Sequence, residues 1–312
     1  MAQKYSRGSA RFSGSYSYHS PVQARPLPVR RRSTRHRKTP LIIVAGLLLL
    51  FGAHTLSSHH AAAHDLSVAP AQAQQVTLQH QRLAALDNQL QQLIADNPQL
   101  DISISVGPAN STGGLQHYGV ADSFDAASTA KLLTAADYLH HVERGQASLT
   151  QTIQGEKASQ WLQAMIVHSD DTAWAALNDY LTHNDLANYA VSVGFTQYNV
   201  ADNLLPSSDI AGLLQKLYSH KLLNTANTAL LLGYMKQANF RDYIVPAVPS
   251  DYTVYHKVGI NNDDVHDAAI ISHDSQAIVL VIYTNGHGTY NWDNRAQLMQ
   301  TITADAVRAY LS

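Results

Sequence analysis

The sequence contains no cysteine and only two glutamates, Glu143 and Glu156, among its 312 residues. The absence of cysteine excludes disulfide bonds, thiol catalysis and metal sites with cysteine ligands. Because both glutamates precede Ser169, any acidic side chain that acts later in the chain must be an aspartate. The histidines at positions 54, 59, 60 and 64 fall in an Ala- and Ser-rich stretch. We interpret them as linker composition, so that neither a metal nor a cofactor is expected.

Acidic residues are also absent from residues 1–40, which contain ten of the 21 lysines and arginines. The rest of the chain holds 11 basic and 23 acidic residues, so nucleic acid is not an expected partner of the folded part. An apolar segment at 41–56 follows the basic tail, which is the arrangement of a membrane anchor or an export signal. The positive flank favours an anchor in the membrane, with the tail in the cytoplasm and the C-terminal part outside.

Two alternatives remain open for the segment 41–56. Its strictly apolar part, 41–53, is short for a membrane-spanning helix, which needs ~17–25 residues. Cleavage at the small residues 61–63 or 71–73 would instead release a secreted protein. We therefore expect a single-pass protein of the cell membrane with an extracytoplasmic C-terminal domain, or a secreted protein if the segment is cleaved.

Periodic apolar patterns begin only at Val76. Residues 1–40 lack such a pattern and are rich in Ser, Tyr, Arg and Pro, which predicts a disordered cytoplasmic tail. Residues 57–75 are rich in Ala, His, Gln and Ser and are interpreted as a linker. The folded domain is therefore expected at 76–312.

Within this domain, strand patterns occur near both ends and helical patterns lie between them. Leucines at 3–4 spacing predict a first helix from Val76 that Pro98 ends. The other predicted elements are strands at 99–108, 115–120, 252–259, 267–274 and 276–286, a mostly helical block at about 129–240, and a helix at 291–311. This order predicts an α+β fold, in which one antiparallel sheet built from both chain ends packs against the terminal helices and an inserted all-α lobe forms a second part.

The stretch FDAASTAKLLTAADYL places Ser128 and Lys131 three residues apart at the start of a helical pattern. At that spacing the two side chains share a face of the helix. A serine at a helix N-terminus lies beside free backbone N–H groups, which can stabilise an oxyanion, and a buried lysine with a lowered pKa can accept its proton. The alternative is an N-capping serine followed by a surface lysine.

Two further segments complete the pattern. Ser169-Asp170-Asp171 interrupts an apolar stretch just before a helix, where the alternative is again an N-cap. Lys257 and Gly259 lie on a late strand, where glycine allows a ligand backbone to approach closely and an inward lysine supplies positive charge. The alternative for Lys257 is an exposed lysine on an edge strand.

The order S-x-x-K, S-D-x, K-x-G resembles the motif set of class A β-lactamases and penicillin-binding DD-peptidases, a superfamily of serine hydrolases. The likeness extends from about residue 76 to the C-terminus. The segments that carry it are YGVADSFDAASTAK, MIVHSDDTAW, LLPSSDIAGLLQKL and IVPAVPSDYTVYHKVG. It implies the β-lactamase/transpeptidase fold and an acyl-enzyme mechanism.

Carried over to this chain, the resemblance implies that Ser128 is the nucleophile and Lys131 its base. Ser169 would relay a proton to the leaving nitrogen, and Lys257 would supply charge that holds the substrate carboxylate. The backbone N–H groups of Ser128 and Ile260 would form the oxyanion hole. Asp170 is expected to brace its loop rather than to take part in chemistry.

The chain departs from the family pattern at three places. The asparagine of S-D-N is Asp171, which keeps an acceptor for a substrate but loses the amide donor. The threonine of K-T-G is Val258. Only the short segment 197–206 stands where class A β-lactamases have a long loop with a deacylating glutamate, and Asp202 is a weak substitute for that residue.

The resemblance and these departures together predict an extracytoplasmic enzyme that forms an acyl-Ser128 intermediate and hydrolyses it slowly. The expected acyl donors are β-lactams or D-Ala-D-Ala-type peptidoglycan stem peptides. A catalytically silent module that binds peptidoglycan through the same cleft remains an alternative. A membrane adaptor that acts through residues 1–40 could coexist with either function.

Overall fold

The computed structural model describes residues 68–288 and 292–312. They belong to one compact unit, Ala61–Ser312. The predictions for the basic tail, for segment 41–56 and for most of the linker fall outside the described residues. In the part of the chain that is described, no helix combines the length and apolar character needed to cross a membrane.

A five-stranded antiparallel sheet forms the centre of the unit, in the order β2-β1-β9-β8-β7. The strands are β1 (Asp101–Pro108), β2 (Gln116–Gly119), β7 (Thr253–Asn261), β8 (Asp264–His273) and β9 (Gln276–Asn285). β1 pairs with β9, with Ile104 opposite Ile282, so strands from the two ends of the chain meet in the middle of the sheet. The predicted sheet built from both chain ends is confirmed.

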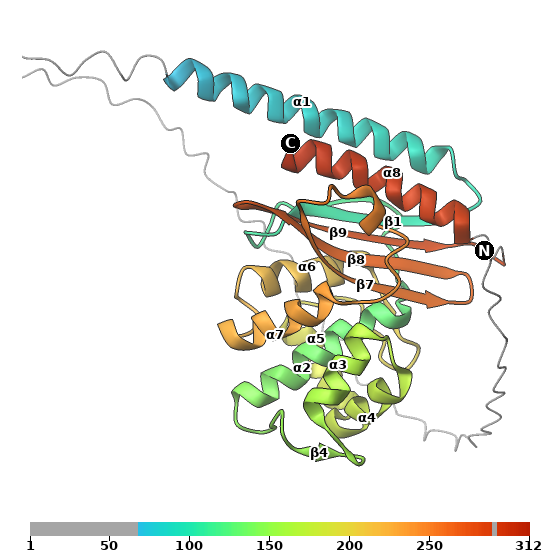
Figure 1. The fold of residues 1–312 in the computed structure, drawn as a ribbon. Helices are drawn as coiled ribbons and strands as arrows, with labels where there is room; N and C mark the ends of the chain where they lie inside the picture. Colours follow the sequence, from blue (N-terminus) through green and yellow to red (C-terminus); the bar gives the residue numbers. More distant parts are fainter. Residues whose placement is uncertain (1–67, 289–291) are drawn as a thin grey trace, which may run out of the picture. The chain divides into compact units, whose positions relative to one another are not determined.

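The two terminal helices, α1 (Val68–Ala95) and α8 (Trp292–Leu311), lie side by side on one face of the sheet (Figure 1). Ile102, Ile104 and Val106 of β1 are buried in the core beneath them. The alternation of these residues with serines is what predicted the strand. The first helix begins at Val68 rather than Val76, so the residues 68–75, predicted as linker, are helical.

The other face of the sheet carries the predicted all-α lobe, in which a second apolar core forms (Figure 1). Its elements are the 3₁₀ helix η1 (Ala127–Ala130) and the helices α2 (Lys131–Glu143), α3 (Ala158–Val167), α4 (Asp171–Leu181), α5 (His183–Ser192), α6 (Ser207–Tyr218) and α7 (Thr225–Lys236). Short pairs join β3 (Phe124–Asp125) to β6 (Leu204–Leu205) and β4 (Thr152–Ile153) to β5 (Glu156–Lys157), and a 3₁₀ turn, η2 (Val245–Ala247), precedes β7. Helix α6 packs on β1 and β9 and joins the lobe to the sheet.

Serine hydroxyls connect this lobe to the sheet. Ser103 and Ser105 of β1 point away from the terminal helices and are fully buried. Both hydrogen-bond to the hydroxyl of Ser207 at the start of α6, at 2.8 and 2.9 Å. Buried hydroxyls cost stability when they lack partners, so this cluster explains how β1 can present polar residues to the lobe.

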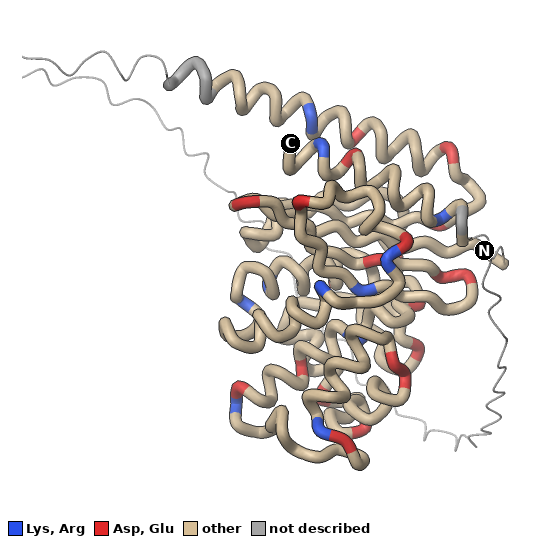
Figure 2. Tube along the Cα trace, viewed as in Figure 1, with Lys and Arg blue, Asp and Glu red and all other residues tan. Residues whose placement is uncertain are grey.

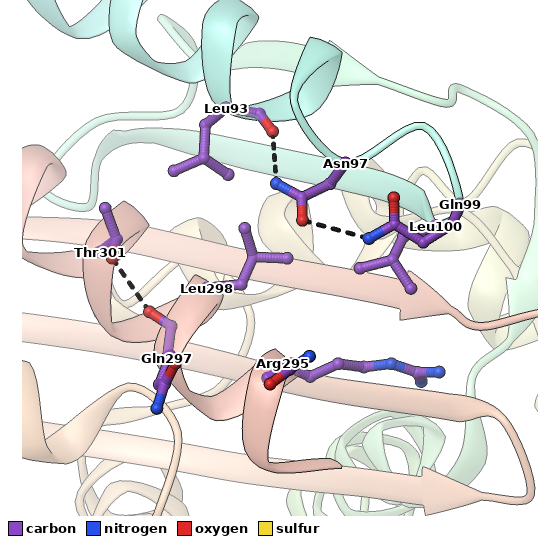
Figure 3. A pocket seen from close by; sticks show the side chains of 9 residues that line it. Leu93, Asn97, Gln99, Leu100, Arg295, Gln297, Leu298 and Thr301 are labelled. Atoms are coloured by element: carbon purple, nitrogen blue, oxygen red, sulfur yellow. Dashed lines mark hydrogen bonds between the residues drawn. The ribbon is translucent and has the colours of Figure 1, made fainter. Parts of the chain in front are cut away.

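A cavity of about 570 Å³ lies between the end of α1 and the start of α8, on the face of the sheet opposite the lobe (Figure 3). It is lined by Leu93, Asn97, Gln99, Leu100, Asn294, Arg295, Gln297, Leu298 and Thr301. None of the predicted site residues lines it.

The edge strand β7 packs directly against η1, and Gly259 lies at the point of contact. A Cβ atom at this position would be 2.8 Å from the carbonyl oxygen of Ala126 and 3.1 Å from the backbone nitrogen of Ser128. No side chain fits there without moving the strand from the turn. Gly233 of α7 is different, because a Cβ atom there meets nothing within 4 Å.

We expect Gly259→Ala to lower the free energy of unfolding by about 1–3 kcal/mol, because the added methyl group overpacks the contact between β7 and η1. The matched control, Gly233→Ala, should raise it by about 0.5–1 kcal/mol, because alanine is the better helix former. Denaturant unfolding of the two variants measures both effects. Equal stabilities would show that β7 and η1 are not held at this distance.

The lobe also contains a buried carboxyl group, that of Asp137 in α2. Its side chain is 1% exposed, and His141 Nδ1 lies 3.2 Å from its Oδ1. Among the described residues, neither carboxyl oxygen has a well-oriented hydrogen-bond partner. Burial raises the pKa of Asp137 to about 7, with His141 opposing this shift and Asp185 adding to it.

A carboxyl group with a raised pKa in the folded state favours folding when it is protonated. The stability of the protein should therefore fall as the pH rises from about 4 to 8, through the pKa of about 7 that Asp137 has in the folded state. We expect the stability of Asp137→Asn to be closest to that of the parent protein near pH 4, and to exceed it by a growing margin up to about pH 8. Thermal unfolding of both proteins across this range measures the effect, and parallel pH profiles would contradict it.

Candidate active site

Ser128 lies in a turn whose backbone is held by polar side chains on both sides. It occupies η1, just after β3, and the preceding residue Ala127 has a positive φ of 47°, which is strained for a residue other than glycine. Asp125 Oδ1 accepts a hydrogen bond from the Ala127 N–H at 2.9 Å. Asn203 Nδ2 donates to the Ala127 carbonyl and to Asp125 Oδ1, both at 3.1 Å. The strained turn is thus fixed by its surroundings, as is common where a reactive side chain is presented.

A second group of buried residues supports this turn from the sheet. Thr129 Oγ1 donates to the Ala126 carbonyl at 2.6 Å and contacts the Tyr283 hydroxyl at 2.5 Å. His266 stacks on the Tyr283 ring with 4.0 Å between ring centroids. Burial lowers the pKa of His266 to about 4, so its ring is neutral at pH 7.

The hydrogen bonds of His266 also assign its tautomer. Nδ1 lies 3.1 Å from the backbone N–H of Thr284 and accepts from it. Nε2 therefore carries the proton and donates to the Asp125 carbonyl at 2.7 Å. The sequence analysis did not identify the residues that support the Ser128 turn, because no local pattern links them to Ser128. These residues are Asp125, Asn203, Tyr283 and His266.

Lys131, the first residue of α2, has a completely buried side chain. Its Nζ donates to Asp171 Oδ1 at 2.6 Å and to the Ser169 carbonyl at 2.7 Å, and it lies 5.3 Å from the centroid of the Trp174 ring. Burial lowers the pKa of Lys131, and the contact with Asp171 opposes this shift. Among the described residues, none hydrogen-bonds to the Ser128 hydroxyl, so Lys131 Nζ points toward Ser169 and Asp171 instead.

Ser169 lies in the connection between α3 and α4, with a positive φ of 58°. Its hydroxyl oxygen is 2.8 Å from Lys257 Nζ and 3.5 Å from Lys131 Nζ, so it lies between the two amines. Asp170 is the N-cap of α4 and accepts from the Ala173 N–H at 2.8 Å. The prediction that Asp170 braces its loop is confirmed.

Lys257 lies on β7 and is 2% exposed. Besides the contact with Ser169, its Nζ donates to the Val258 carbonyl at 2.9 Å. Burial and the nearby charge of Lys131 lower the pKa of Lys257 to about 7, while Asp267 and Asp171 oppose this shift. Near neutral pH this amine can therefore exist without its extra proton.

The two backbone N–H groups predicted to form an oxyanion hole belong to neighbouring segments. Gly259 brings β7 to within van der Waals distance of the Ser128 backbone nitrogen. Ile260 follows directly on the same strand and pairs with Val265 of β8. Because β7 is the edge of the sheet, its outer backbone groups are free of ladder partners and face η1.

The three departures from the family pattern have distinct structural settings. Asp171 forms the ion pair with Lys131, although its own side chain is 87% exposed. Val258 is buried in the core beneath the terminal helices and does not replace a cleft hydroxyl. Asp202 is exposed and accepts from the Asn199 amide at 2.8 Å within its own loop. Asn203, the next residue, is the part of this loop that contacts the Ser128 turn.

The purely structural alternatives for the motif residues, an N-capping serine and exposed lysines, do not fit this geometry. The N-cap of α2 is Ala130, which makes no side-chain cap, so Ser128 is not a capping serine. Lys131 and Lys257 are buried rather than exposed, and buried lysines are rare unless they are paired. The Ser169 hydroxyl lies between the buried amines of Lys131 and Lys257. Ser128, on the strained turn, precedes Lys131 by three residues. Within residues 68–288 and 292–312, no group of three or more His, Asp or Glu side chains is placed to hold a metal ion.

Comparisons with known proteins agree with the fold. Several solved structures match with about 20% identity, among them PBP-A in an acyl-enzyme complex with penicillin G (TM-score 0.67, 21% identity, 73% of this chain and 96% of that chain). Others are a β-lactamase from Xanthomonas campestris (0.64, 21%, 73% and 99%) and an ancestral class A β-lactamase of Gram-negative bacteria (0.65, 20%, 72% and 100%). No curated protein matches the sequence.

The solved structures are too distant in sequence to assign the chain to a family, but a family model does assign it. It is described as the β-lactamase enzyme family and matches residues 85–310, which is almost all of the described domain. The match includes all the motif segments, the C-terminal part of α1 and nearly all of α8. The chain therefore belongs to the β-lactamase enzyme family.

Proposed function

We propose that this protein is an extracytoplasmic serine hydrolase that forms an acyl-enzyme on Ser128. The observation that carries the proposal is the burial of Lys131 and Lys257 around the Ser169 hydroxyl, next to the strained turn of Ser128. Burying two amines costs several kcal/mol, and buried titratable groups with perturbed pKa values cluster at functional sites. A proton-handling site beside a presented serine hydroxyl suits acyl transfer.

The geometry supports acylation in three ways. Ser128 is the nucleophile, and the buried amine of Lys131 belongs to the same helical segment, three residues later, where it lies beside Ser169. The N–H groups of Ser128 and Ile260 stabilise the oxyanion, an effect worth ~3–4 kcal/mol per donor where it has been measured. Lys257 gives positive charge for a substrate carboxylate, and Gly259 leaves room for the substrate backbone along β7.

Hydrolysis of the acyl-enzyme is expected to be slow. It needs a water molecule activated by a base, and both glutamates of the chain precede Ser169. Asp202 is exposed and bonded to Asn199, and Asp125 is occupied with Ala127, Asn203 and Asn261. Asp171 is engaged by Lys131. No aspartate in this part of the described structure is placed as a persuasive replacement.

β-Lactams and D-Ala-D-Ala-type stem peptides are the proposed acyl donors. The penicillin G acyl-enzyme of PBP-A, on a similar fold, supports the first class. The basic tail and apolar segment 41–56 support a location at the cell membrane with the domain outside, where wall peptides are within reach. Figure 2 shows scattered basic residues and more numerous acidic ones along the described trace, which fits a small-molecule or peptide substrate.

Incubation with benzylpenicillin should add one equivalent to the protein, located on Ser128 by intact mass and peptide mapping. Ser128→Ala should abolish the adduct, and the exposed control Ser111→Ala should keep it. With nitrocefin we expect a burst of about one equivalent per enzyme, followed by a much slower steady state because deacylation lacks an activated water.

Two outcomes would contradict this proposal. Fast sustained turnover would show that another residue replaces the missing glutamate. A parent protein that forms no adduct, but binds peptidoglycan as well as Ser128→Ala does, would show a silent binding module instead.

A further inference from the structure

The Lys131 amine faces an aromatic ring as well as oxygen atoms. Its Nζ lies 5.3 Å from the centroid of the Trp174 ring, within the ~6 Å over which an aromatic face attracts a cation. Because the Lys131 side chain is completely buried, little water competes for this contact. The ring is thus a third neighbour of the amine, beside Asp171 and the Ser169 carbonyl.

A chain of hydrogen bonds sets the orientation of the Trp174 ring. Its Nε1 donates to Thr134 Oγ1 at 2.9 Å, and Thr134 Oγ1 donates to Asn178 Oδ1 at 3.0 Å. The Thr134 side chain is fully buried. A buried hydroxyl that both donates and accepts is restrained in its rotation, so the indole ring is held in one orientation.

Helical spacing brings these groups together. Asp171, Trp174 and Asn178 are three and four residues apart, so they share one face of α4. Lys131 and Thr134 share a face of α2 in the same way, and the two helices pack against each other. The lysine therefore meets the carboxylate and the ring, while the threonine meets the ring N–H and the amide.

Charged groups act on the Lys131 amine from two elements. Asp171 and Asp170, at the start of α4, favour its ammonium form. Lys257 on β7 opposes that form, because the two amines repel each other when both are charged. The Trp174 ring adds an attraction for the ammonium form without adding a charge of its own.

We propose that Trp174, fixed by Thr134, is a positioning residue for Lys131 and stabilises the cation that Lys131 becomes during acylation. This inference rests on the proposed acylation of Ser128, with Lys131 as the base. As Ser128 Oγ bonds to the acyl carbon, its proton passes to Lys131 Nζ, and Lys131 gives the proton up to the leaving nitrogen when the C–N bond breaks. A contact that strengthens as this charge develops lowers the barrier.

Removal of the ring should change the pH dependence of acylation. The neutral form of Lys131 is the base, so the rate rises with pH as the ammonium form is lost. In Trp174→Leu the ammonium form loses a stabilising contact, so the pKa of Lys131 falls and the rise begins at lower pH. The limiting rate above the rise should fall about 3–10-fold, because the developing cation loses the same contact.

The rate of benzylpenicillin acylation, followed by intact mass from about pH 5 to about pH 10, measures both changes. Trp174→Phe keeps an aromatic face and should lie closer to the parent than Trp174→Leu does. Trp161→Leu is the matched control. Trp161 is also half-buried in the lobe, and its Nε1 donates to the Ile153 carbonyl at 2.8 Å. Its loss should leave the shape of the pH profile unchanged.

Two results for Trp174→Leu would overturn the inference. A rate lowered equally at every pH would show that the ring only supports the lobe. A rise that begins at higher pH than in the parent would show that the ring only keeps water away from the amine.

Thr134 provides a second pair of variants if Trp174→Leu does not fold. Thr134→Val removes the acceptor of the indole N–H and should move the pH profile in the same direction as Trp174→Leu, by a smaller amount. Thr134→Ser keeps the hydroxyl and should keep the profile of the parent. A parent-like profile in Thr134→Val would overturn the assignment of Thr134 and Trp174.

A direct titration of Lys131 separates failure of this inference from failure of the proposed function. The ¹³Cε chemical shift of labelled lysine, assigned with Lys131→Arg, reports the pKa of Lys131 without any substrate. This pKa should be lower in Trp174→Leu than in the parent. A parent protein that forms no adduct would remove the proposed function, and this inference with it. In an active parent, an unchanged pKa of Lys131 in Trp174→Leu would overturn this inference alone.

Discussion

The contact between two buried amines and one serine hydroxyl is the interaction on which the rest of the site depends. Lysine is almost never fully buried without a partner, and here Lys131 and Lys257 are both removed from solvent. Asp171 compensates the first by an ion pair, while Ser169 and the Val258 carbonyl solvate the second. Such an arrangement is stable only if every element that carries one of these groups is held in place.

Those elements come from distant parts of the chain. Lys131 begins α2, Ser169 lies between α3 and α4, and Lys257 lies on the edge strand of a sheet that needs both chain ends to form. The serine cluster at Ser207 joins the sheet to α6, and Gly259 lets β7 touch the Ser128 turn. The sheet and the lobe are therefore two halves of a single site.

Much of this could be predicted from the sequence because the relevant patterns are local. Alternation in β1 and leucine spacing in α1 reflect periodicities of 2 and 3.6, and they predicted the sheet and its terminal helices. The start of α1 was placed eight residues late, because the apolar spacing begins at Val76 although the backbone is helical from Val68. The motif residues were identified by spacing and order, and the structure brings Lys131, Ser169 and Lys257 into contact.

The parts that could not be predicted depend on contacts between residues far apart in sequence. Asn203 and Asp125 hold the Ser128 turn, and His266 supports it from β8, although no local pattern distinguishes any of them. The direction of the Lys131 side chain is a similar case. Its spacing from Ser128 allows contact with the hydroxyl, but Asp171 offers a charged oxygen, and a charge-assisted bond is about twice as strong as a neutral one.

Position 171 has a carboxylate where the S-D-N motif has the amide of asparagine. The two side chains differ far more in charge than in shape. Either side chain offers an oxygen to Lys131, so the 2.6 Å contact alone does not require aspartate. What the carboxylate adds is a negative charge that opposes the lowering of the Lys131 pKa by burial. Burial is the main cause of the lowered pKa of Lys257, and the charge of Lys131 lowers it further. Asp171 therefore compensates Lys131 by direct contact, whereas it acts on Lys257 only through a longer-range Coulomb interaction.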